Sequence, residues 1–456
     1  MKIHDTLSGL KSDFIPLGDK VRMYVCGITP YSSAHVGHAM SAIVFDVIRR
    51  YLEHKGHEVV HIQNFTDVDD KLIDRSLAEG EQVQNISERY IQEYFSALKI
   101  LNVRPATDYP RATQEISSMI DFIKVLISLE FAYEVAGDVF FRVTKDPSYG
   151  KLSRRSLDSM RSSLGVEGSD KKEHPMDFSL WKSTKPGEPS WQSPWGLGRP
   201  GWHIECSAMA FNYLGETIDI HGGGQDLVFP HHENEIAQSQ AFNHGAQLAK
   251  FWIHNGMMLF EDEKMSKSLG NLVTIDEAIE KHSANALRYL VLSSHYRSPA
   301  TYSDELMVSA DRAFKRLANA IIAESGDGID LDYNSFQERF LLSMDDDFNT
   351  PQALAAMFDF VREINSSIAL GGNTRIAQSQ LRQLAENVFG FDFTEPEVEI
   401  PEDLINKIHN LIEKREILRT QKQYSDADLI RQELLDLGIE LTDSHKGTNW
   451  QFKTTT

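Results

Sequence analysis

The 456-residue sequence predicts an α/β protein built on a parallel sheet, with an inserted segment, a run of helices and a small C-terminal unit. Two observations favour the sheet: residues 21–65 have a strand, helix, strand pattern, and strand-like sequence returns after residue 200. The third observation is a hydrophobic content of 41%, which suffices for at least one large core and excludes global disorder. Ligands of such a sheet are expected at the carboxyl ends of its strands.

The first strand–helix–strand unit lies near the N-terminus. The β-branched, alternating segment VRMYVCG (21–27) predicts a strand, and apolar residues near helical spacing predict a helix over 38–55. Gly56 is expected to end this helix, and EVVHIQNF (58–65) predicts the second strand. Because a short helical crossover joins parallel neighbours, this unit predicts a parallel sheet.

The next segments predict an insertion. Residues 68–135 carry amphipathic helical patterns, whereas 136–200 contain the strand-like GDVFFRV and a Pro-, Gly-, Ser- and Trp-rich stretch from 183 to 200. We expect 136–200 to fold beside the sheet, and the sheet to resume near 201 with a strand that carries Cys206. Helices are expected from 300 to about 390, followed by the acidic linker TEPEVEIPED and a small terminal unit.

The net charge of −21 disfavours a polyanionic partner on average, but the charge is unevenly distributed. Residues 321–403 contain 17 acidic and 4 basic side chains, whereas 404–456 contain 8 of each. The acidic block is expected to be a solvated helical surface. Only two cysteines are present, no secretory signal is evident at the N-terminus, and no stretch is apolar enough to span a bilayer. These features predict a protein of a reducing, cytoplasmic compartment without a membrane segment.

Two short motifs indicate phosphate chemistry. HVGH (35–38) stands at a strand-to-helix junction, where a helix N-terminus and two imidazoles can donate to phosphate, and Gly37 would let a flat ring approach. KMSKS (264–268) places two lysines in a loop, where they can stabilise charge on a transferring phosphoryl group. Each motif alone is compatible with an ordinary polar surface.

A third motif, HGGGQD (221–226), follows the strand-like TIDI. Three consecutive glycines indicate a backbone that another group approaches closely, and a nucleotide is the obvious candidate, with a plain turn as the alternative.

A fourth motif, PHHENE (230–235), has the spacing of metal ligands. On a helix His231 and Glu235 share a face, and Cys26 and Cys206 could reach the same crevice of the sheet. Two thiolates, an imidazole and a carboxylate would suit Zn²⁺. The alternatives are that the cysteines are small buried apolar residues, and that His232 is the ligand in place of His231.

Together these motifs resemble those of the class I aminoacyl-tRNA synthetases, and most closely the cysteinyl-tRNA synthetase family. The resemblance covers nearly the whole chain and rests on YVCGITPYSSAHVGH, NFTDVDDK, PGWHIECSAM, DIHGGGQDLVFPHHENEIAQ and EKMSKSLGN, in the order of the family. It continues more weakly through ALRY, MDDDFNTPQAL and the terminal DADLIRQELLDLGIEL and GTNW.

The resemblance implies a role for each motif. The metal ligands would be Cys26, Cys206, His231 and Glu235, and one Zn²⁺ per chain would bind the substrate thiolate. Thr66 and Trp202 would line the cysteine pocket. The nucleotide would be held by His35, Gly37, His38, His221, Gly222, Gly223, Gly224 and Asp226, and Lys264 and Lys267 would act on its triphosphate.

The implied reaction is activation of L-cysteine by ATP with Mg²⁺, followed by transfer to the 3′-terminal ribose of tRNA(Cys), in a monomer. The implied domains are a Rossmann-type catalytic domain in two halves (1–115 and 201–260), a connective domain for the acceptor end (116–200), a KMSKS and stem-contact region (261–315), a helical bundle (316–392) and an anticodon-binding domain (401–456). Possible anticodon contacts are Arg415, Arg419, Lys422, Arg431 and Trp450.

Two other functions are compatible with parts of the sequence. A ligase that joins cysteine to an aminosugar in mycothiol synthesis shares the zinc, HVGH and KMSKS chemistry, but it would not need the terminal unit. A non-catalytic zinc- or RNA-binding relative would not need intact HVGH and KMSKS motifs.

Overall fold

The computed structural model describes residues 1–164, 171–260, 263–264, 272–394, 402–421, 423–437, 439–444 and 447–452. The chain forms two compact units, residues 1–392 and residues 393–456. None of the helices in these described segments is both long and apolar enough to cross a membrane.

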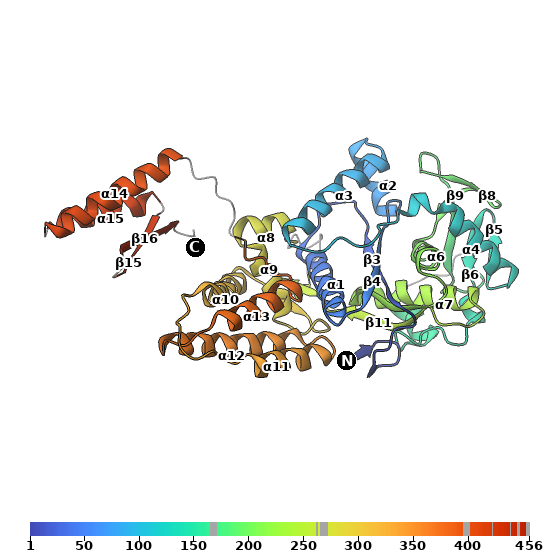
Figure 1. Ribbon diagram of the computed structural model, residues 1–456. Coiled ribbons are helices and arrows are strands. Elements are labelled where there is room, and N and C mark those ends of the chain that lie inside the picture. Colours follow the sequence, from blue (N-terminus) through green and yellow to red (C-terminus); the bar gives the residue numbers. More distant parts are fainter. Residues whose placement is uncertain are drawn as a thin grey trace. The chain divides into compact units, whose positions relative to one another are not determined.

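A four-stranded parallel sheet forms the centre of the first unit (Figure 1). Its strand order is β11-β10-β3-β4, and each neighbouring pair is parallel. The strands are β3 (Lys20–Ile28), β4 (Glu58–Phe65), β10 (Ile218–Gly224) and β11 (Ala249–Asn255). Since β3 and β4 flank the helix α1 (Val36–His54), the predicted strand–helix–strand unit is confirmed.

Helices cover both faces of this sheet. In Figure 1, α1 lies on one side, and α6 (Trp202–Leu214) and α7 (Glu233–Phe242) lie on the other. The prediction that Cys206 lies on a strand is wrong, because Cys206 is in the middle of α6. Gly201 and Gly215 flank a 13-residue helix whose buried side chains include Ala208 and Ala210, residues that favour helix.

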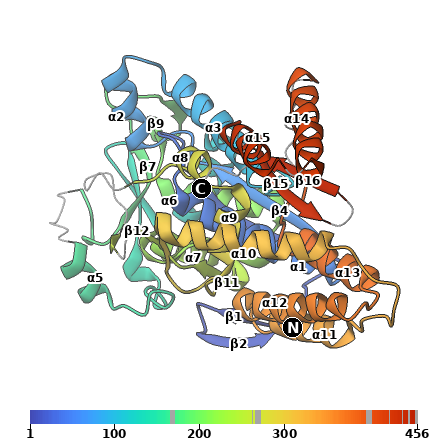
Figure 2. The same cartoon turned by 90° about the vertical axis from the view of Figure 1, so that its left-hand side faces the viewer.

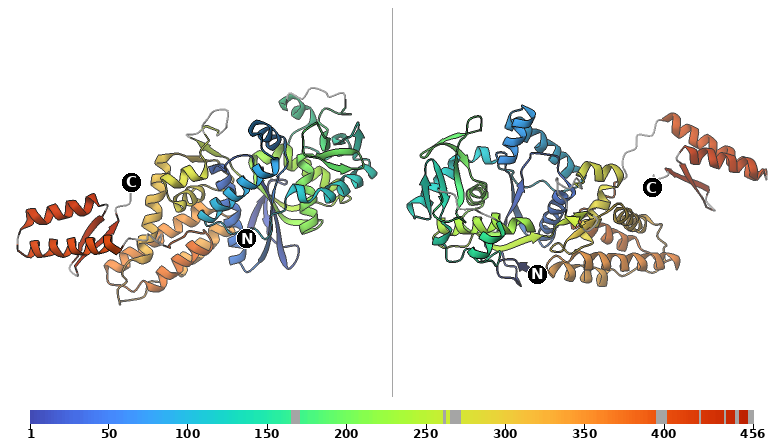
Figure 3. Two further views of the ribbon diagram at one scale, coloured as in Figure 1. Left: turned by 90° about the horizontal axis from the view of Figure 1, so that it is seen from above. Right: turned by 180° about the vertical axis from the view of Figure 1, so that it is seen from behind.

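Residues 132–200, which precede α6, contain a second sheet. It is antiparallel, with strand order β5-β6-β7-β9-β8. Its elements are β5 (Ala132–Val135), β6 (Asp138–Phe141), β7 (Phe178–Ser183), β8 (Trp191–Ser193) and β9 (Gly196–Pro200), with α4 (Ile116–Ser128), α5 (Leu157–Leu164) and the short turns Ala112–Gln114 and Val143–Lys145. Both views in Figure 3 place this sheet beside α6 and α7, and one buried apolar cluster, which includes Phe141, Trp181 and Met209, joins them.

The remaining elements of the first unit are an N-terminal hairpin, two helices after β4, a small three-stranded sheet and a helical bundle (Figure 2). They are β1 (Lys2–Asp5), β2 (Leu10–Asp13), α2 (Asp70–Glu79), α3 (Val83–Ile100), β12 (Met258–Phe260), β13 (Glu263–Lys264), β14 (Ala300–Tyr302), α8 (Ile275–Lys281), α9 (Ala284–Leu292), α10 (Asp304–Ile322), α11 (Asn334–Asp345), α12 (Thr350–Ala369) and α13 (Arg375–Asn387). The sequence predicts helices from residue 300 to about 390, and among the described elements of that range β14 is the exception.

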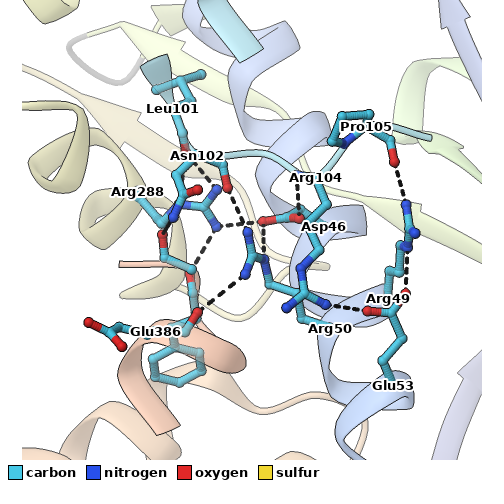
Figure 4. Close-up of polar contacts among 12 residues, drawn as sticks. Asp46, Arg49, Arg50, Glu53, Leu101, Asn102, Arg104, Pro105, Arg288 and Glu386 are labelled. Carbon is cyan, nitrogen blue, oxygen red and sulfur yellow. Dashed lines mark hydrogen bonds and ion pairs between the residues drawn. The ribbon is translucent and has the colours of Figure 1, made fainter. Parts of the chain in front are cut away.

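A buried ionic node joins α1 to the bundle (Figure 4). The Asp46 carboxylate on α1 accepts from Arg50 and from Arg288 of α9, at 2.8 Å each. The same two guanidinium groups donate to backbone carbonyls that follow α3, at Leu101 and Asn102, and to carbonyls in and after α13. The node therefore connects the first helix of the parallel sheet to the helical bundle.

The second unit contains two helices and a hairpin. They are α14 (Glu402–Thr420), α15 (Tyr424–Asp436), β15 (Ile439–Ser444) and β16 (Gly447–Phe452). Its small core includes Ile408, Ile430, Leu434 and Ile439.

Candidate active site and metal centre

A cavity of about 370 Å³ opens at the carboxyl ends of β3 and β4 and at the first turn of α1. This is where ligands of a parallel sheet are expected. Of the predicted site residues, those that line the cavity are Cys26, His35, Gly37, His38, Thr66, Trp202, Cys206, Gly224, Asp226 and His231.

The HVGH motif forms the first turn of α1. His35 is the N-cap, and its Nδ1 accepts from the Gly37 N–H at 3.1 Å, while His38 Nδ1 accepts from the His35 N–H at 3.2 Å. The two rings stack with centroids 3.8 Å apart. Burial, reinforced by the charges of His35 and Lys71, lowers the pKa of His38 to about 3. His38 is therefore neutral at pH 7 and acts through hydrogen bonds beside the positive end of the helix dipole.

Four potential metal ligands meet at the inner end of this cavity. Cys26 Sγ on β3 lies 3.6 Å from Cys206 Sγ on α6 and 3.5 Å from Glu235 Oε1 on α7. His231, in the π turn that leads into α7, places Nε2 3.0 Å from the same Glu235 oxygen. One ligand atom from each of the four lies within 4.8 Å of the others, and all four side chains are buried. The donor set and its spacing fit Zn²⁺.

The electrostatics of this cluster favour an anionic Cys206 and an anionic Glu235 beside a neutral Cys26. Burial raises the pKa of Cys26, whose thiol donates to Cys206. Burial acts on Cys206 in the same sense, but the hydrogen bond from Cys26 and the charge of His231 lower its pKa to about 6. Against burial, the charges of His221 and His231 hold the pKa of Glu235 well below its usual range. A thiolate and a carboxylate are the ionised forms that a divalent cation requires.

A second group around the cluster is formed by Cys26, His221 and His232. His232 Nε2 lies 3.2 Å from Cys26 Sγ but 3.9 Å from Glu235, and its Nδ1 is 2.7 Å from His254 Nε2. His231 instead contacts His203, and the Nδ1 atoms of the two rings are 3.0 Å apart. This contact orients Nε2 of His231 toward Glu235.

The predicted cysteine-pocket residues lie beside the cluster. Trp202 stacks on His231 with ring centroids 4.3 Å apart and keeps 36% of its surface exposed. Thr66 follows β4, is buried, and accepts from the Asn64 amide at 3.4 Å. An aromatic face and a hydroxyl thus border the space next to the potential metal ligands.

The sequence predicts that HGGG is a loop against which a nucleotide packs. In the structure the segment is instead the end of strand β10, which extends to Gly224. A Cβ on Gly222 would lie 2.2 Å from the Phe45 ring, and one on Gly223 would lie 2.9 Å from the His232 ring, so protein side chains occupy these approaches. His221 is fully buried and its Nε2 lies 2.9 Å from Glu235 Oε2. His221, Gly222 and Gly223 do not line the cavity, whereas Gly224 and Asp226 do.

Some predicted residues fall outside this description. Lys264 belongs to β13, and residues 265–268, with Lys267, lie outside the described residues. Lys422 is also outside them, and Trp450 is described only as part of β16. Arg419 and Arg431 are exposed.

Arg415 was expected to be available to an anticodon, and this expectation is wrong. It is buried to 4% exposure, and Nη1 lies 3.4 Å from the Thr448 hydroxyl. The helical pattern of α14 could have placed it on the inner face.

The cavity is also lined by residues outside the predicted motifs and outside the predicted site, among them Tyr31, Gln63, Lys71 and Asn255. For two of them the sequence position could have predicted a place at the site. Gln63 lies near the carboxyl end of a predicted strand and Lys71 follows that end within a few residues, and ligands of a parallel sheet bind at these ends.

Comparisons with known proteins agree with this fold. The family model described as the catalytic domain of class I (C) tRNA synthetases matches residues 14–312, and the DALR domain model matches residues 339–394. A methionyl-tRNA synthetase of Mycobacterium tuberculosis, solved with methionyl-adenylate, superposes with a TM-score of 0.60 at 16% identity, over 87% of this chain and 94% of that one. Fold and family model together define a class I aminoacyl-tRNA synthetase.

Sequence relatives narrow the class. A cysteine–tRNA ligase of Dehalococcoides mccartyi is 52% identical over 100% of both chains. Another, of Geobacter metallireducens, is 46% identical over 99% of this chain and 100% of the relative. The chain belongs to the cysteine–tRNA ligase family.

Proposed function

We propose that this chain activates L-cysteine with ATP and Mg²⁺ to cysteinyl-adenylate, and then transfers the cysteinyl group to the 3′-terminal ribose of tRNA(Cys). The observation that carries the proposal is the convergence of Cys26, Cys206, His231 and Glu235 within 4.8 Å at the cavity that HVGH also lines. A site for a thiol and a site for a triphosphate thus share one space.

In this proposal one Zn²⁺ per chain, held by those four side chains, selects the substrate by binding its thiolate. Serine differs from cysteine by a single atom, and packing alone discriminates such pairs weakly. A soft thiolate ligand is preferred over a neutral hydroxyl, so selection needs no editing site. Thr66 and the Trp202 face border the amino acid and position its carboxylate.

The remaining residues hold the nucleotide. The N–H groups of the first turn of α1, together with His35 and His38, bind the phosphates, and Gly37, Gly224 and Asp226 border the nucleoside. Lys264 and Lys267 stabilise the charge that develops as pyrophosphate leaves. No side chain acts as a nucleophile, so the catalysis is positioning and charge stabilisation.

The rest of the chain would serve the tRNA. We propose that residues 116–200 contact its acceptor end, that 261–315 and the bundle at 316–392 follow its stem, and that 401–456 bind the anticodon. Arg419 and Arg431, both exposed, are available for that contact. The enzyme would act as a monomer in the cytoplasm, where its two free thiols persist.

The test is cysteine-dependent ATP–pyrophosphate exchange, followed by charging of tRNA(Cys) and zinc analysis. We expect exchange, charging and one zinc per chain, and we expect Cys206→Ala to lose the zinc. Ser239→Ala is the matched control, because it removes one buried polar atom of α7 outside the cluster. Exchange with an aminosugar product and no charging would instead identify the aminosugar ligase, and wild-type protein without zinc would refute the metal site.

A further inference from the structure

The active-site cavity contains a cation that the proposed function has not used. Lys71 is the one lysine or arginine among the described residues that line this cavity. It lies in the first turn of α2, where the Asp69 side chain accepts from the Lys71 backbone N–H at 2.9 Å and caps the helix. The backbone that carries this ammonium group is therefore fixed.

The charge of Lys71 has no anionic partner in the described part of the chain. The neighbouring carboxylate, Asp70, is held by Lys182 at 2.7 Å and by Arg199, both from the antiparallel sheet. Lys71 Nζ lies instead 5.3 Å from the centroid of the Tyr31 ring. Lys71 is exposed to solvent, so its charge is available to an anionic group that enters the cavity.

The neighbouring histidine cannot replace this charge. His38 is neutral at pH 7, because burial and the charges of His35 and Lys71 lower its pKa to about 3. A neutral imidazole can donate a hydrogen bond to phosphate but does not neutralise it. Lys71 therefore supplies formal charge where His38 supplies only hydrogen bonds.

The position of Lys71 lies between the two substrates. Its Nζ lies over the ring of Tyr31 in the β3–α1 connection, and its charge acts on His38 at the nucleotide end of the cavity. Thr66, five residues earlier, borders the cysteine end. We infer that Lys71 is a further catalytic residue of the activation step, with its ammonium group on the α-phosphate of ATP. There the cysteine carboxylate forms the new bond to phosphorus, and the bond to pyrophosphate breaks with its electron pair leaving on pyrophosphate. This inference rests on the proposed function.

The test compares Lys71→Met and Lys71→Arg with the wild type in cysteine-dependent ATP–pyrophosphate exchange. We expect Lys71→Met to lower kcat of exchange roughly tenfold or more, with little change in the KM for cysteine or in the zinc content. Lys71→Arg keeps the charge and should recover most of the rate. Lys145→Met is the matched control, since Lys145 also lies over an aromatic ring, at 5.2 Å from the Phe131 centroid, but outside the cavity.

The outcomes separate this inference from the proposed function. Wild-type protein without cysteine-dependent exchange would overturn both. Active wild type with an unchanged exchange rate in Lys71→Met would overturn the role of Lys71 alone. A loss confined to tRNA charging would also overturn it, because Lys71 would then contact tRNA rather than the α-phosphate. An equal loss in Lys145→Met would show that the effect is not specific to the cavity.

Discussion

Single residues at the metal cluster show how sequence spacing can predict chemistry. The motif PHHENE and two isolated cysteines are far apart along the chain, yet the structure brings Cys26, Cys206, His231 and Glu235 together. Spacing on a helix explains the pair from PHHENE, but it could not choose between His231 and His232. That choice depends on the second contact of each ring, with His203 in one case and His254 in the other, and those contacts are visible only in the folded chain.

Another single residue, His61 on β4, predicts how stability depends on pH. Burial, assisted by the charge of Arg49, lowers the pKa of His61 to about 3, and neither ring nitrogen has a hydrogen-bond partner among the described residues. The unfolded residue binds a proton below about pH 6.5 and the folded one does not, so stability is full above that pH and falls on acidification.

We therefore expect His61→Leu to be less sensitive to acid than the wild type. Between pH 7 and pH 5 the wild type should lose about 2 kcal/mol more free energy of unfolding than the variant. Urea unfolding at the two pH values measures this difference. The control is His244→Asn, at an exposed histidine with φ of 52°, a conformation that asparagine tolerates. Parallel losses in wild type and His61→Leu would contradict the assignment.

Whole elements were predicted well where their pattern was periodic and less well where it was not. The strands at 20–28 and 58–65 and the helix between them follow from alternation and helical spacing. The segment at 202–214 is a helix buried around most of its circumference, so its sequence has no strong helical period and predicts a strand instead. The glycines of HGGG were ambiguous in another way. Three consecutive glycines indicate that another group packs closely against the backbone, but the sequence does not show whether that group is a ligand or a side chain of the protein itself.

Strand β10 provides the test of that interpretation. A Cβ at Gly222 would stand 2.2 Å from the buried Phe45 ring of α1, so Gly222→Ala should destabilise the fold by about 1–3 kcal/mol through overpacking. Gly18→Ala, where no heavy atom lies within 4 Å of the added carbon, is the control. Chemical denaturation measures both, and Phe45→Leu in the Gly222→Ala background should recover part of the loss. Unchanged stability with weakened ATP binding would favour the nucleotide interpretation instead.

At the scale of the whole molecule, one buried carboxylate connects α1 to the helical bundle. Asp46 is the carboxylate that both Arg50 and Arg288 share, and all three residues are buried (Figure 4). Their partners come from α1, α9 and the ends of α3 and α13, elements that the sequence places far apart. The Asp46–Arg50 pair is local, since the two residues are four apart on α1. No local pattern could have predicted the contacts with Arg288 and with the backbone carbonyls, because these groups are close only after folding.

We expect Asp46→Asn to cost about 3–5 kcal/mol, because it leaves two buried guanidinium groups without their counter-charge. The matched control is Asp121→Asn, which removes one exposed helical ion pair with Lys124 and should cost less than about 1 kcal/mol. Thermal and urea unfolding give both values. A loss no larger than that of the control would mean that the backbone carbonyls alone stabilise the arginines.

The charge of the whole chain also describes less than it first suggested. The net −21 is concentrated in residues 321–403, whereas the unit proposed for the anticodon is neutral. Average charge predicts solubility, and local cations such as Lys71 decide binding.

Gly201 forms the junction between the antiparallel sheet and α6. This single residue separates β9 from the helix that carries Trp202 and Cys206, and it donates to the Leu180 carbonyl at 2.9 Å while a Cβ there would stand 1.9 Å from the Ser179 oxygen. The backbone at Gly201 is therefore held against β7 on the side of the antiparallel sheet. The position of the Trp202 ring at the cavity thus depends on how the antiparallel sheet packs, although none of the strands of that sheet carries a ligand of the metal cluster among the described residues.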